Sequence, residues 1–394
     1  MRPLRILHVT PYAGDAWAYG GIPRLLQTIT QGLSRRGHQV TVCTTDACDA
    51  STRLARAASS VEGSVDVRVF RNLSNALAYH LQLFIPLGFG KYMRRFAGTF
   101  DVAHLHACRN LPGVIAAYHL RRAGVPYVIA PNGTAPRIER RQMAKRFFDA
   151  IEGGRTLRGA SRVLAVSQAE RRQLSAWGVD ARAVRVIPNP IALDEFASPI
   201  AKGRFRQRFA LPSGPLVLFL GRLTPRKRLD VVARAMARLR HSEASLVIAG
   251  NDMGAGAAAQ SLARALGLEE RTFFTGLLRG QERLEALADA DVMVYPSEHE
   301  IFGLAPLESL LAGTPVVVAD DSGCGEVITA TGGGHVVALG DADALARAID
   351  TMLDDPARWR GAAADAAVRV RAAYGDDVVC GALEQLYGEM IGAS

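Results

Sequence analysis

Short runs of apolar residues recur along the whole chain and alternate with longer segments of amphipathic character. In the first half, these runs predict strands at residues 4–10, 40–44, 65–70, 100–106, 126–131, 162–167 and 184–187. In the second half, they predict strands at 216–220, 245–249, 272–275, 292–295 and 316–318. Continuous apolar runs of this length are typical of strands buried on both faces, as in a parallel sheet covered by helices. We therefore predict an α/β protein built from two Rossmann-like units.

The composition is that of a folded, globular protein. The 394 residues suggest two or three domains, and 49% of them are hydrophobic while 22% are charged. The five cysteines are scattered without a disulfide or zinc pattern, which favours a reducing compartment. Residues 1–9 predict a strand rather than an export signal, and the longest uncharged apolar run, 81–90, is too short to span a bilayer. We therefore expect a cytoplasmic protein.

The charge is divided unevenly between the two halves. Residues 1–195 carry 27 Lys and Arg against 13 Asp and Glu, a balance of +14, and residues 196–394 carry 20 against 25, a balance of −5, which together give the net +9. A basic half suits an anionic partner, which could be a nucleic acid, a membrane surface or a phosphorylated acceptor. Because no zinc-finger or aromatic RNA-binding pattern accompanies the charge, we do not expect nucleic acid as the partner.

Two segments of the basic half combine several Lys and Arg with aromatic residues, at 81–96 and at 137–151. Such segments suit the interface of an anionic membrane or a lipid-linked phosphate. Alternatively, their apolar sides pack on the sheet and their arginines stay in water. Arg137 and Arg141, four residues apart, follow Asn132 at the end of a predicted strand, and we assign these three residues to acceptor binding.

Two glutamates, Glu300 and Glu308, stand eight positions apart between the predicted strands 292–295 and 316–318. Gly303 lies between them and lets the backbone turn close to a ligand, because it has no Cβ. A helix predicted at 306–312 would offer unpaired N–H groups and the positive end of its dipole to a phosphate. Glu308, inside that helix, then suits ribose hydroxyls, and Glu300, in the loop, suits a second polyol. Alternatively, the segment is an ordinary loop, helix and strand with two solvated glutamates.

A strongly cationic loop, residues 221–228, directly follows a buried strand. Arg222 can fork onto phosphate oxygens, and Lys227 can act as a point charge on the same group. We expect the two other arginines of the loop, Arg226 and Arg228, to be solvated. The loop therefore predicts an anion-binding site.

His104 and His106 lie on one face of the predicted strand 100–106. His106 is at the carboxyl end of this strand, where ligands collect in open α/β sheets, so it is the better candidate for chemistry. His104 is better explained as a satisfied buried histidine. We predict no metal here, because no third ligand lies near the two histidines in sequence.

Two weaker patterns allow both a functional and a structural interpretation. Gly20 and Gly21 precede a helix predicted at 22–36 and mark either a simple turn or a close approach of the backbone to a ligand. Two Asp-x-Asp tripeptides, 289–291 and 341–343, could bind a metal and a diphosphate. The first falls at a helix–strand junction and the second at a helix start, where aspartate caps, so we interpret both as structural.

Taken together, these motifs resemble the retaining glycosyltransferases of family 4, which have the GT-B fold. The resemblance rests on the Glu-x7-Glu pair with its surrounding Ser297, Phe302-Gly303, Pro306 and Gly313-Thr314-Pro315, on Gly221-Arg222 with Lys227, on the strand Asp101 to His106, and on Pro188-Asn189-Pro190. It implies two Rossmann-like domains that face each other across a cleft. The first would comprise residues 1–195 with a last helix, 376–394, that crosses back to it, and the second residues 196–375.

The resemblance also implies roles for single residues. Four would act in catalysis: Arg222 and Lys227 on the leaving diphosphate, Glu300 on the donor hydroxyls, and His106 beside the reacting sugar. Glu308 would bind the ribose. The remaining donor contacts would come from Gly20, Gly21, Leu278, Phe302, Gly303 and Leu304. No metal and no cofactor apart from the nucleotide sugar is implied.

The implied activity is retaining transfer of a hexosyl group from a UDP- or GDP-sugar. The acceptor would be a glycan or a lipid-linked molecule in cell-surface polysaccharide synthesis, with the protein cytoplasmic and either free or peripheral on the inner membrane face. Three alternatives stay open: a soluble sugar or sugar-phosphate acceptor, a nucleotide-sugar epimerase of the same fold, and a non-catalytic nucleotide-sugar-binding subunit.

Overall fold

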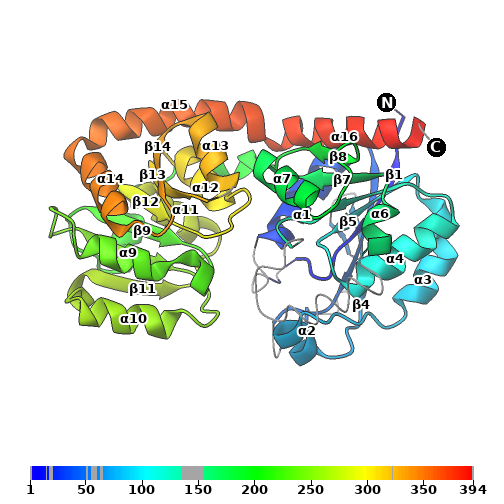
Figure 1. Ribbon diagram of the computed structural model, residues 1–394, viewed down its shortest axis with the longest axis horizontal. Helices are drawn as coiled ribbons and strands as arrows, with labels where there is room; N and C mark the ends of the chain where they lie inside the picture. The colour runs from blue at the N-terminus through cyan, green and yellow to red at the C-terminus, as the bar shows by residue number, and fades with distance from the viewer. Residues whose placement is uncertain are drawn as a thin grey trace. The chain divides into compact units, whose positions relative to one another are not determined.

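The computed structural model describes residues 2–14, 16, 21–49, 52–54, 60–62, 65–134, 154–321 and 323–392. The chain folds as two compact units, and the boundary on the first pass of the chain follows Pro190. The first unit comprises Met1–Pro190 together with Asp376–Ser394, and the second comprises Ile191–Gly375. Each unit is an open sheet flanked by helices, so the predicted α/β class is confirmed (Figure 1).

Among the described residues of the first unit, eight strands form one sheet in the order β3-β4-β2-β1-β5-β6-β7-β8. Only the short edge strand β3 is antiparallel to its neighbour. The strands are β1 (Arg5–Val9), β2 (Gln39–Thr45), β3 (Ser60–Glu62), β4 (Val65–Phe70), β5 (Val102–His106), β6 (Tyr127–Ala130), β7 (Arg162–Ala165) and β8 (Val184–Val186). The helices are α1 (Ile22–Arg35), α2 (Asn75–Leu81), α3 (Phe89–Phe96), α4 (Leu111–Arg122), α6 (Gly154–Arg158), α7 (Gln168–Ala176) and α16 (Asp376–Gly392), with a 3-10 turn at Ala97–Thr99.

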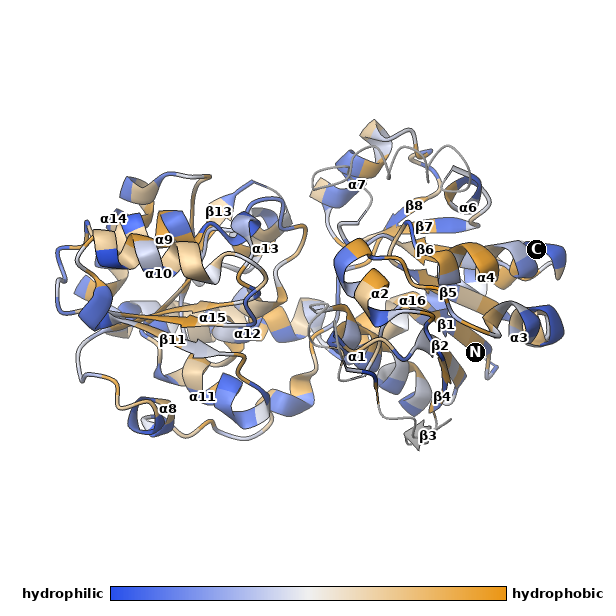
Figure 2. Ribbon diagram, turned by 90° about the horizontal axis from the view of Figure 1, so that it is seen from below, coloured by the Kyte–Doolittle hydropathy of each residue, from blue (hydrophilic) through white to orange (hydrophobic). Residues whose placement is uncertain are grey.

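Alternation along the strands divides the apolar residues of this unit between two cores. Ile6 of β1 packs with α1 and α16 on one face of the sheet, and Leu7 packs with α3 and α4 on the other. The last helix lies directly on α1, because Gly32 leaves room for Cys380: a Cβ at Gly32 would stand 2.5 Å from the Cys380 Sγ. Figure 2 shows the strands mostly in hydrophobic colours, as two buried faces require.

The second unit contains a parallel sheet of six strands in the order β11-β10-β9-β12-β13-β14. The strands are β9 (Leu216–Leu220), β10 (Ser245–Ala249), β11 (Thr272–Gly276), β12 (Val292–Tyr295), β13 (Val316–Asp320) and β14 (Gly334–Ala338). The helices are α8 (Arg204–Arg208), α9 (Leu229–Met236), α10 (Gly256–Ala265), α11 (Gly280–Asp289), α12 (Leu304–Leu311), α13 (Gly323–Thr331), α14 (Ala342–Asp354) and α15 (Pro356–Tyr374). Single 3-10 turns lie at Leu193–Phe196, Pro225–Lys227 and Glu269–Arg271.

Each strand predicted from an apolar run is confirmed, with ends that differ by one or two residues. Two strands were not predicted. β3 is a short edge strand, and β14 is only partly buried and contains a glycine and a histidine, so it lacks a continuous apolar run. The predicted helix at 306–312 begins earlier, at Leu304, because Gly303 takes a left-handed conformation and starts the helix at once.

Both sheets reverse their strand order at one point, between β1 and β5 in the first unit and between β9 and β12 in the second. In open α/β sheets, ligands bind outside the carboxyl ends of the strands at this reversal. The loops after β5, β9 and β12 are therefore the places to look for a site. Of the helices that the structure describes, none has the length and apolarity needed to cross a bilayer.

Candidate active site

The four cations of the loop after β9 lie in different environments. Arg222 is exposed, whereas Lys227 is 9% exposed. Arg226 was expected to be solvated, but its guanidinium donates to the carbonyl of His299 at 2.7 Å and to that of Glu298 at 3.3 Å. Arg228, also expected in water, pairs with the carboxylate of Asp230. Arg226 therefore holds the loop after β12 against the loop after β9.

Lys227, Tyr295 and Glu300 form a three-membered hydrogen-bonded cluster at the carboxyl ends of β9 and β12. The Lys227 Nζ donates to Glu300 Oε2 at 2.6 Å and to the hydroxyl of Tyr295. The Tyr295 hydroxyl in turn donates to Glu300 Oε2 at 3.1 Å. The Lys227 ammonium also lies over the Tyr295 ring, 4.3 Å from its centroid. Lys227 and Glu300, which were both predicted to contact the donor, are therefore hydrogen-bonded to each other. Tyr295, which contacts both, was not predicted.

Burial and the attraction between Lys227 and Glu300 act on the pKa values of this cluster. Burial lowers the pKa of Lys227, and attraction to Glu300 acts in the opposite direction. Burial by itself would raise the pKa of Glu300, but attraction to Lys227 and its hydrogen bond outweigh it and bring the pKa below its ordinary value. Burial also raises the pKa of Tyr295, which keeps the phenol protonated as a donor. The site therefore holds a basic and an acidic group next to each other.

The turn before α12 is closely packed. Gly303 has φ of +80°, and a Cβ there would stand 2.6 Å from the Cys324 Sγ, so both conformation and space require glycine. Phe302 was predicted to touch the donor, but its ring is 2% exposed and packs edge-on against Tyr374 at 5.5 Å. Leu304 is half-buried and opens the helix. Any contact of Phe302 with a ligand would therefore involve its backbone.

Glu308 lies in the second turn of α12 and is 3% exposed. Its carboxylate accepts a hydrogen bond from Arg283 of α11, whose second terminal nitrogen donates to Glu195. Neither Arg283 nor Glu195 was predicted. Glu308 is thus a buried, paired glutamate rather than a solvated one.

Leu278, another predicted donor contact, is buried in the loop after β11, while its neighbour Leu277 is 40% exposed.

In the first unit, three histidines meet at the strand reversal. His8 of β1 is the pairing partner of His104 of β5, and its Nδ1 lies 2.9 Å from the Nε2 of His106. His104 and His106 stack with their ring centroids 4.2 Å apart, and the His104 Nδ1 lies 2.7 Å from the hydroxyl of Tyr387 on α16. Burial lowers the pKa of all three, for His106 to about 3, so all are neutral. The structure buries His106 as completely as His104, although the sequence favoured His104 as the buried structural histidine and His106 as the residue for chemistry.

The three histidines carry the ligand type that transition metals prefer, and one ring nitrogen of each lies within 4.8 Å of the other two. The rings of His104 and His106 are stacked at an interplanar angle of 11°, so their lone pairs lie in nearly parallel planes, and one ring would have to turn for both to bind one ion. Ligands of one ion must converge on a point. The sequence argument against a metal was incomplete, since His8 supplies a third imidazole, and the absence of a metal stays a prediction.

Comparison with known proteins decides the family. Residues 202–368 match the family described as glycosyl transferases group 1, and residues 20–190 match the glycosyl transferase 4-like domain. A D-inositol 3-phosphate glycosyltransferase of Stackebrandtia nassauensis is 32% identical over 75% of this chain and 69% of its own. Another, from Kineococcus radiotolerans, is 29% identical over 93% of this chain and 90% of its own. The chain belongs to the group 1 glycosyltransferases.

The solved structure of Anabaena HepE in complex with UDP and glucose superposes with a TM-score of 0.77 at 20% identity, and covers 98% of this chain and 100% of its own. This likeness confirms the GT-B fold for the glycosyltransferase. The two domain matches also confirm the predicted membership of glycosyltransferase family 4.

The predicted acceptor residues of this glycosyltransferase, and the glycine pair assigned to the donor, are only partly described. Gly20, Arg137 and Arg141 lie outside the described residues. Gly21 is exposed and caps α1 with an ordinary φ of −78°. Asn132, at the end of β6, has φ of +50°, and neither atom of its side-chain amide has a hydrogen-bond partner in the described structure. A strained residue with unsatisfied polar atoms at a strand end is compatible with ligand binding.

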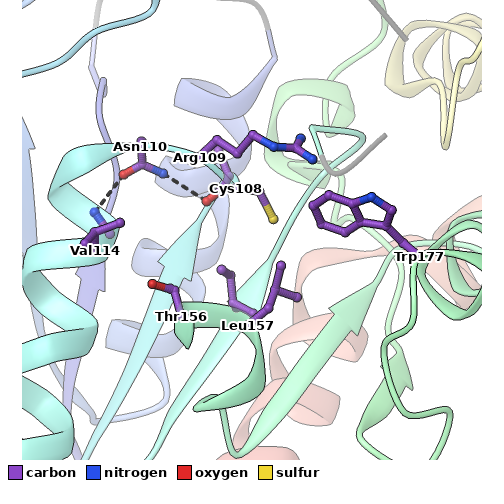
Figure 3. Close-up of a pocket in the computed structure, with 10 residues that line it drawn as sticks. Cys108, Arg109, Asn110, Val114, Thr156, Leu157 and Trp177 are labelled. Atoms are coloured by element: carbon purple, nitrogen blue, oxygen red, sulfur yellow. Dashed lines mark hydrogen bonds between the residues drawn. The ribbon is translucent and has the colours of Figure 1, made fainter. Parts of the chain in front are cut away.

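A hollow in the first unit is lined by the loop after β5, by α4 and α6, by Ile129 of β6 and by Trp177 just after α7 (Figure 3). The Arg109 guanidinium lies 4.3 Å from the centroid of the Trp177 ring and donates to the carbonyl of Thr134 at 2.8 Å. Cys108 and Leu157 contribute apolar surface. Sequence analysis missed this group, since its members are far apart along the chain.

The two Asp-x-Asp tripeptides have structural partners. Asp289 accepts from the backbone N–H groups of Gly203 and Arg206, and Asp291 accepts from that of Leu216. Asp341 caps α14 by accepting from the N–H of Ala344 at 2.8 Å. The structural interpretation of these three carboxylates is therefore confirmed.

Proposed function

We propose that this glycosyltransferase transfers a hexosyl group from a nucleotide-diphosphate sugar, with retention at the anomeric carbon and without a metal ion. The observation that carries the proposal is the Lys227–Tyr295–Glu300 cluster at the strand reversal of the second unit. A basic and an acidic group side by side suit a ligand that joins a diphosphate to a polyol. The solved HepE complex with UDP and glucose supports a UDP-sugar, with a GDP-sugar as the alternative.

The second unit would stabilise the leaving diphosphate. Lys227 would exchange Glu300 for a phosphate oxygen, and the exposed Arg222 would fork onto the same group. The first N–H groups of α12, after Gly303, add the positive end of a helix dipole. Preorganised charges of this kind act on the charge that develops as the bond to the leaving group breaks. Once Lys227 has moved to the diphosphate, Glu300 can accept hydrogen bonds from the donor hydroxyls.

The remaining roles complete the reaction. Glu308 would bind the ribose, and His106, as a neutral imidazole, would orient the sugar. The bond from the anomeric carbon to the diphosphate breaks, and the acceptor oxygen forms its bond to that carbon from the same side. The proton of the acceptor hydroxyl passes to the leaving diphosphate, so no protein base is needed.

Two acceptor classes follow from two different observations. Exposed leucines and cations in the first unit favour a lipid-linked or glycan acceptor for cell-surface polysaccharide, handled at the inner membrane face. The relatives named D-inositol 3-phosphate glycosyltransferase favour a soluble sugar phosphate. An acceptor that carries phosphate is common to both classes.

The test follows release of nucleoside diphosphate from UDP- and GDP-hexoses, with EDTA present, with no acceptor, with inositol phosphate, or with a lipid extract. We expect acceptor-dependent release from one donor, and a loss of at least about 100-fold in both Lys227→Ala and Glu300→Ala. Arg264→Gln, which removes an exposed ion pair elsewhere in the second unit, is the matched control. Full turnover in either variant removes the role assigned to that residue. Conversion of donor without acceptor would identify an epimerase instead, and binding without turnover a non-catalytic subunit.

A further inference from the structure

Arg283 is a buried cation in the middle of the second unit. It lies on α11, is 8% exposed, and directs its guanidinium at two carboxylates from different elements. One terminal nitrogen donates to Glu308 of α12, and the other donates to Glu195 in the 3-10 turn that follows the start of the unit. The side chain of Glu308 is 5% exposed and that of Glu195 36%. Arg283 thus connects a fully buried glutamate to a more exposed one.

A buried ion pair is costly to desolvate, so it contributes little net stability compared with an apolar pair. The energetic cost of breaking it is large, because the remaining charge is left unpaired. Glu308 could be replaced by a leucine if α12 needed only to pack, since its neighbours Leu307 and Leu310 are fully buried. The pair is therefore better explained by a requirement for a carboxylate at this position than by folding.

The guanidinium controls which way that carboxylate faces. The last torsion of a glutamate side chain is broad, so an unsupported carboxylate rotates among many orientations. The planar fork of an arginine fixes the plane of its partner. A carboxylate offers about four acceptor positions, so contact with Arg283 is compatible with further hydrogen bonds from ligand hydroxyls. Arg283 therefore prepares Glu308 to receive a diol in one orientation.

We propose that Arg283 is a positioning residue that orients Glu308 toward the ribose hydroxyls and so gives the enzyme its preference for ribonucleotide donors. The inference rests on the proposed function, in which Glu308 binds the ribose. Arg283 itself need not touch the nucleotide. Glu195 completes the arrangement by holding the second arm of the guanidinium.

The experiment measures binding by calorimetry. The wild-type protein is titrated with UDP and GDP, and then with the 2′,3′-dideoxy form of whichever binds. A hydroxyl that donates to a charged acceptor forms a strong hydrogen bond, so we expect the wild type to prefer the ribonucleotide by at least about tenfold. In Arg283→Gln, we expect this preference to fall below about threefold. The loss should come from weaker ribonucleotide binding, with the dideoxy form nearly unchanged.

Three further variants make the result decisive. Arg283→Lys keeps the charge but not the fork and should retain part of the preference. The double variant Arg283→Gln with Glu308→Gln should lose no more preference than either single variant, because both act on one contact. Arg264→Gln, in an exposed pair at 3.4 Å, should behave as wild type.

If Arg283→Gln weakens binding of the ribonucleotide and of its dideoxy form equally, the role of Arg283 is merely structural and the proposal is overturned. An unchanged preference for the ribonucleotide overturns it too. If Arg283→Gln fails to fold, a full preference in Arg283→Lys overturns it in the same way. Failure of the proposed function looks different, because the wild-type protein would then bind neither UDP nor GDP.

Discussion

Lys227 and Glu300 are hydrogen-bonded to each other, although each has a separate task in the proposed reaction. In that reaction, the diphosphate competes with Glu300 for the Lys227 side chain. This competition costs affinity, but it couples the two tasks, since Glu300 is released for the donor hydroxyls only when Lys227 has moved. Tyr295 contacts both groups and limits how far they separate.

The Tyr295→Phe variant tests this role of the hydroxyl. Phenylalanine fills the same space, so we expect the fold to be kept. Loss of hydrogen bonds to two charged groups should lower kcat/KM for glycosyl transfer by about tenfold, at about 1.4 kcal/mol per factor of ten. Steady-state kinetics with a thermal unfolding curve measure both effects. Tyr118→Phe, on an exposed ring of α4, is the control. An unchanged kcat/KM in Tyr295→Phe would contradict the role.

At the scale of elements, a buried carboxyl joins α7 to the loop after β6. Ser167 caps α7 by accepting from the N–H of Glu170, three residues on. The Glu170 carboxyl accepts from the N–H groups of Gly133 at 2.7 Å and of Val166 at 2.9 Å. Gly133 is the neighbour of Asn132, so this carboxyl supports the loop to which acceptor binding was assigned.

The same carboxyl predicts a pH dependence of stability. Burial raises the pKa of Glu170 to about 7, although its two backbone hydrogen bonds act in the opposite direction. The folded state therefore holds the proton more tightly than the unfolded state, whose carboxyl has a pKa of about 4.3. The contribution of Glu170 to the free energy of unfolding is fully present below about pH 4.3. It falls by on the order of 3 kcal/mol as the pH rises through about 7.

Urea unfolding of the wild type and of Glu170→Gln at pH 5, 6, 7 and 8 measures this effect. The glutamine is neutral at every pH, so the difference between the two proteins should change steadily from pH 5 to about 7 in favour of the variant and level off above that. Loss of one backbone hydrogen bond adds a constant offset that does not vary with pH. If the free energies of unfolding of the two proteins change with pH in parallel, Glu170 does not titrate between pH 5 and 8.

At the scale of the whole molecule, the surface of the first unit joins leucines to cations. Leu73, Leu81, Leu83 and Leu87 are 41–53% exposed, and the backbones of residues 71–73 and 85–87 pair, which brings the leucines of the two segments together. Helix α3 follows directly and exposes Lys91, Arg94 and Arg95. Figure 2 shows hydrophilic colours on this helix. Apolar side chains beside cations suit the interface of an anionic membrane.

Sedimentation with phosphatidylglycerol vesicles tests this surface. Each cation near an anionic membrane contributes about 1 kcal/mol, so replacing Lys91, Arg94 and Arg95 by glutamine should weaken binding by about 100-fold. Salt should weaken wild-type binding too, and phosphatidylcholine vesicles should bind little. Absence of binding to anionic vesicles at low salt would favour the soluble sugar-phosphate acceptor.

The elements of this fold were predictable because their signals are local. An apolar run buries itself as a strand wherever it lies in the sheet, and Gly303 starts α12 because of its own left-handed backbone. For the same reason the sequence placed Arg222, Lys227 and Glu300 in loops after the carboxyl ends of strands, and Glu308 in the helix that follows. Motif spacing also identified the family, which the domain matches confirm.

The partners of these residues were decided only by the tertiary structure. His8 meets His106 across 98 positions because β1 pairs with β5, and Lys227 meets Glu300 across 73 because β9 pairs with β12. Strand order, not spacing, determines such neighbours, and no local pattern encodes it. The sequence by itself therefore determined which charged groups reach the site. The long-range packing decided which of them neutralise each other there, because the cost of burying a charge depends on what lies beside it.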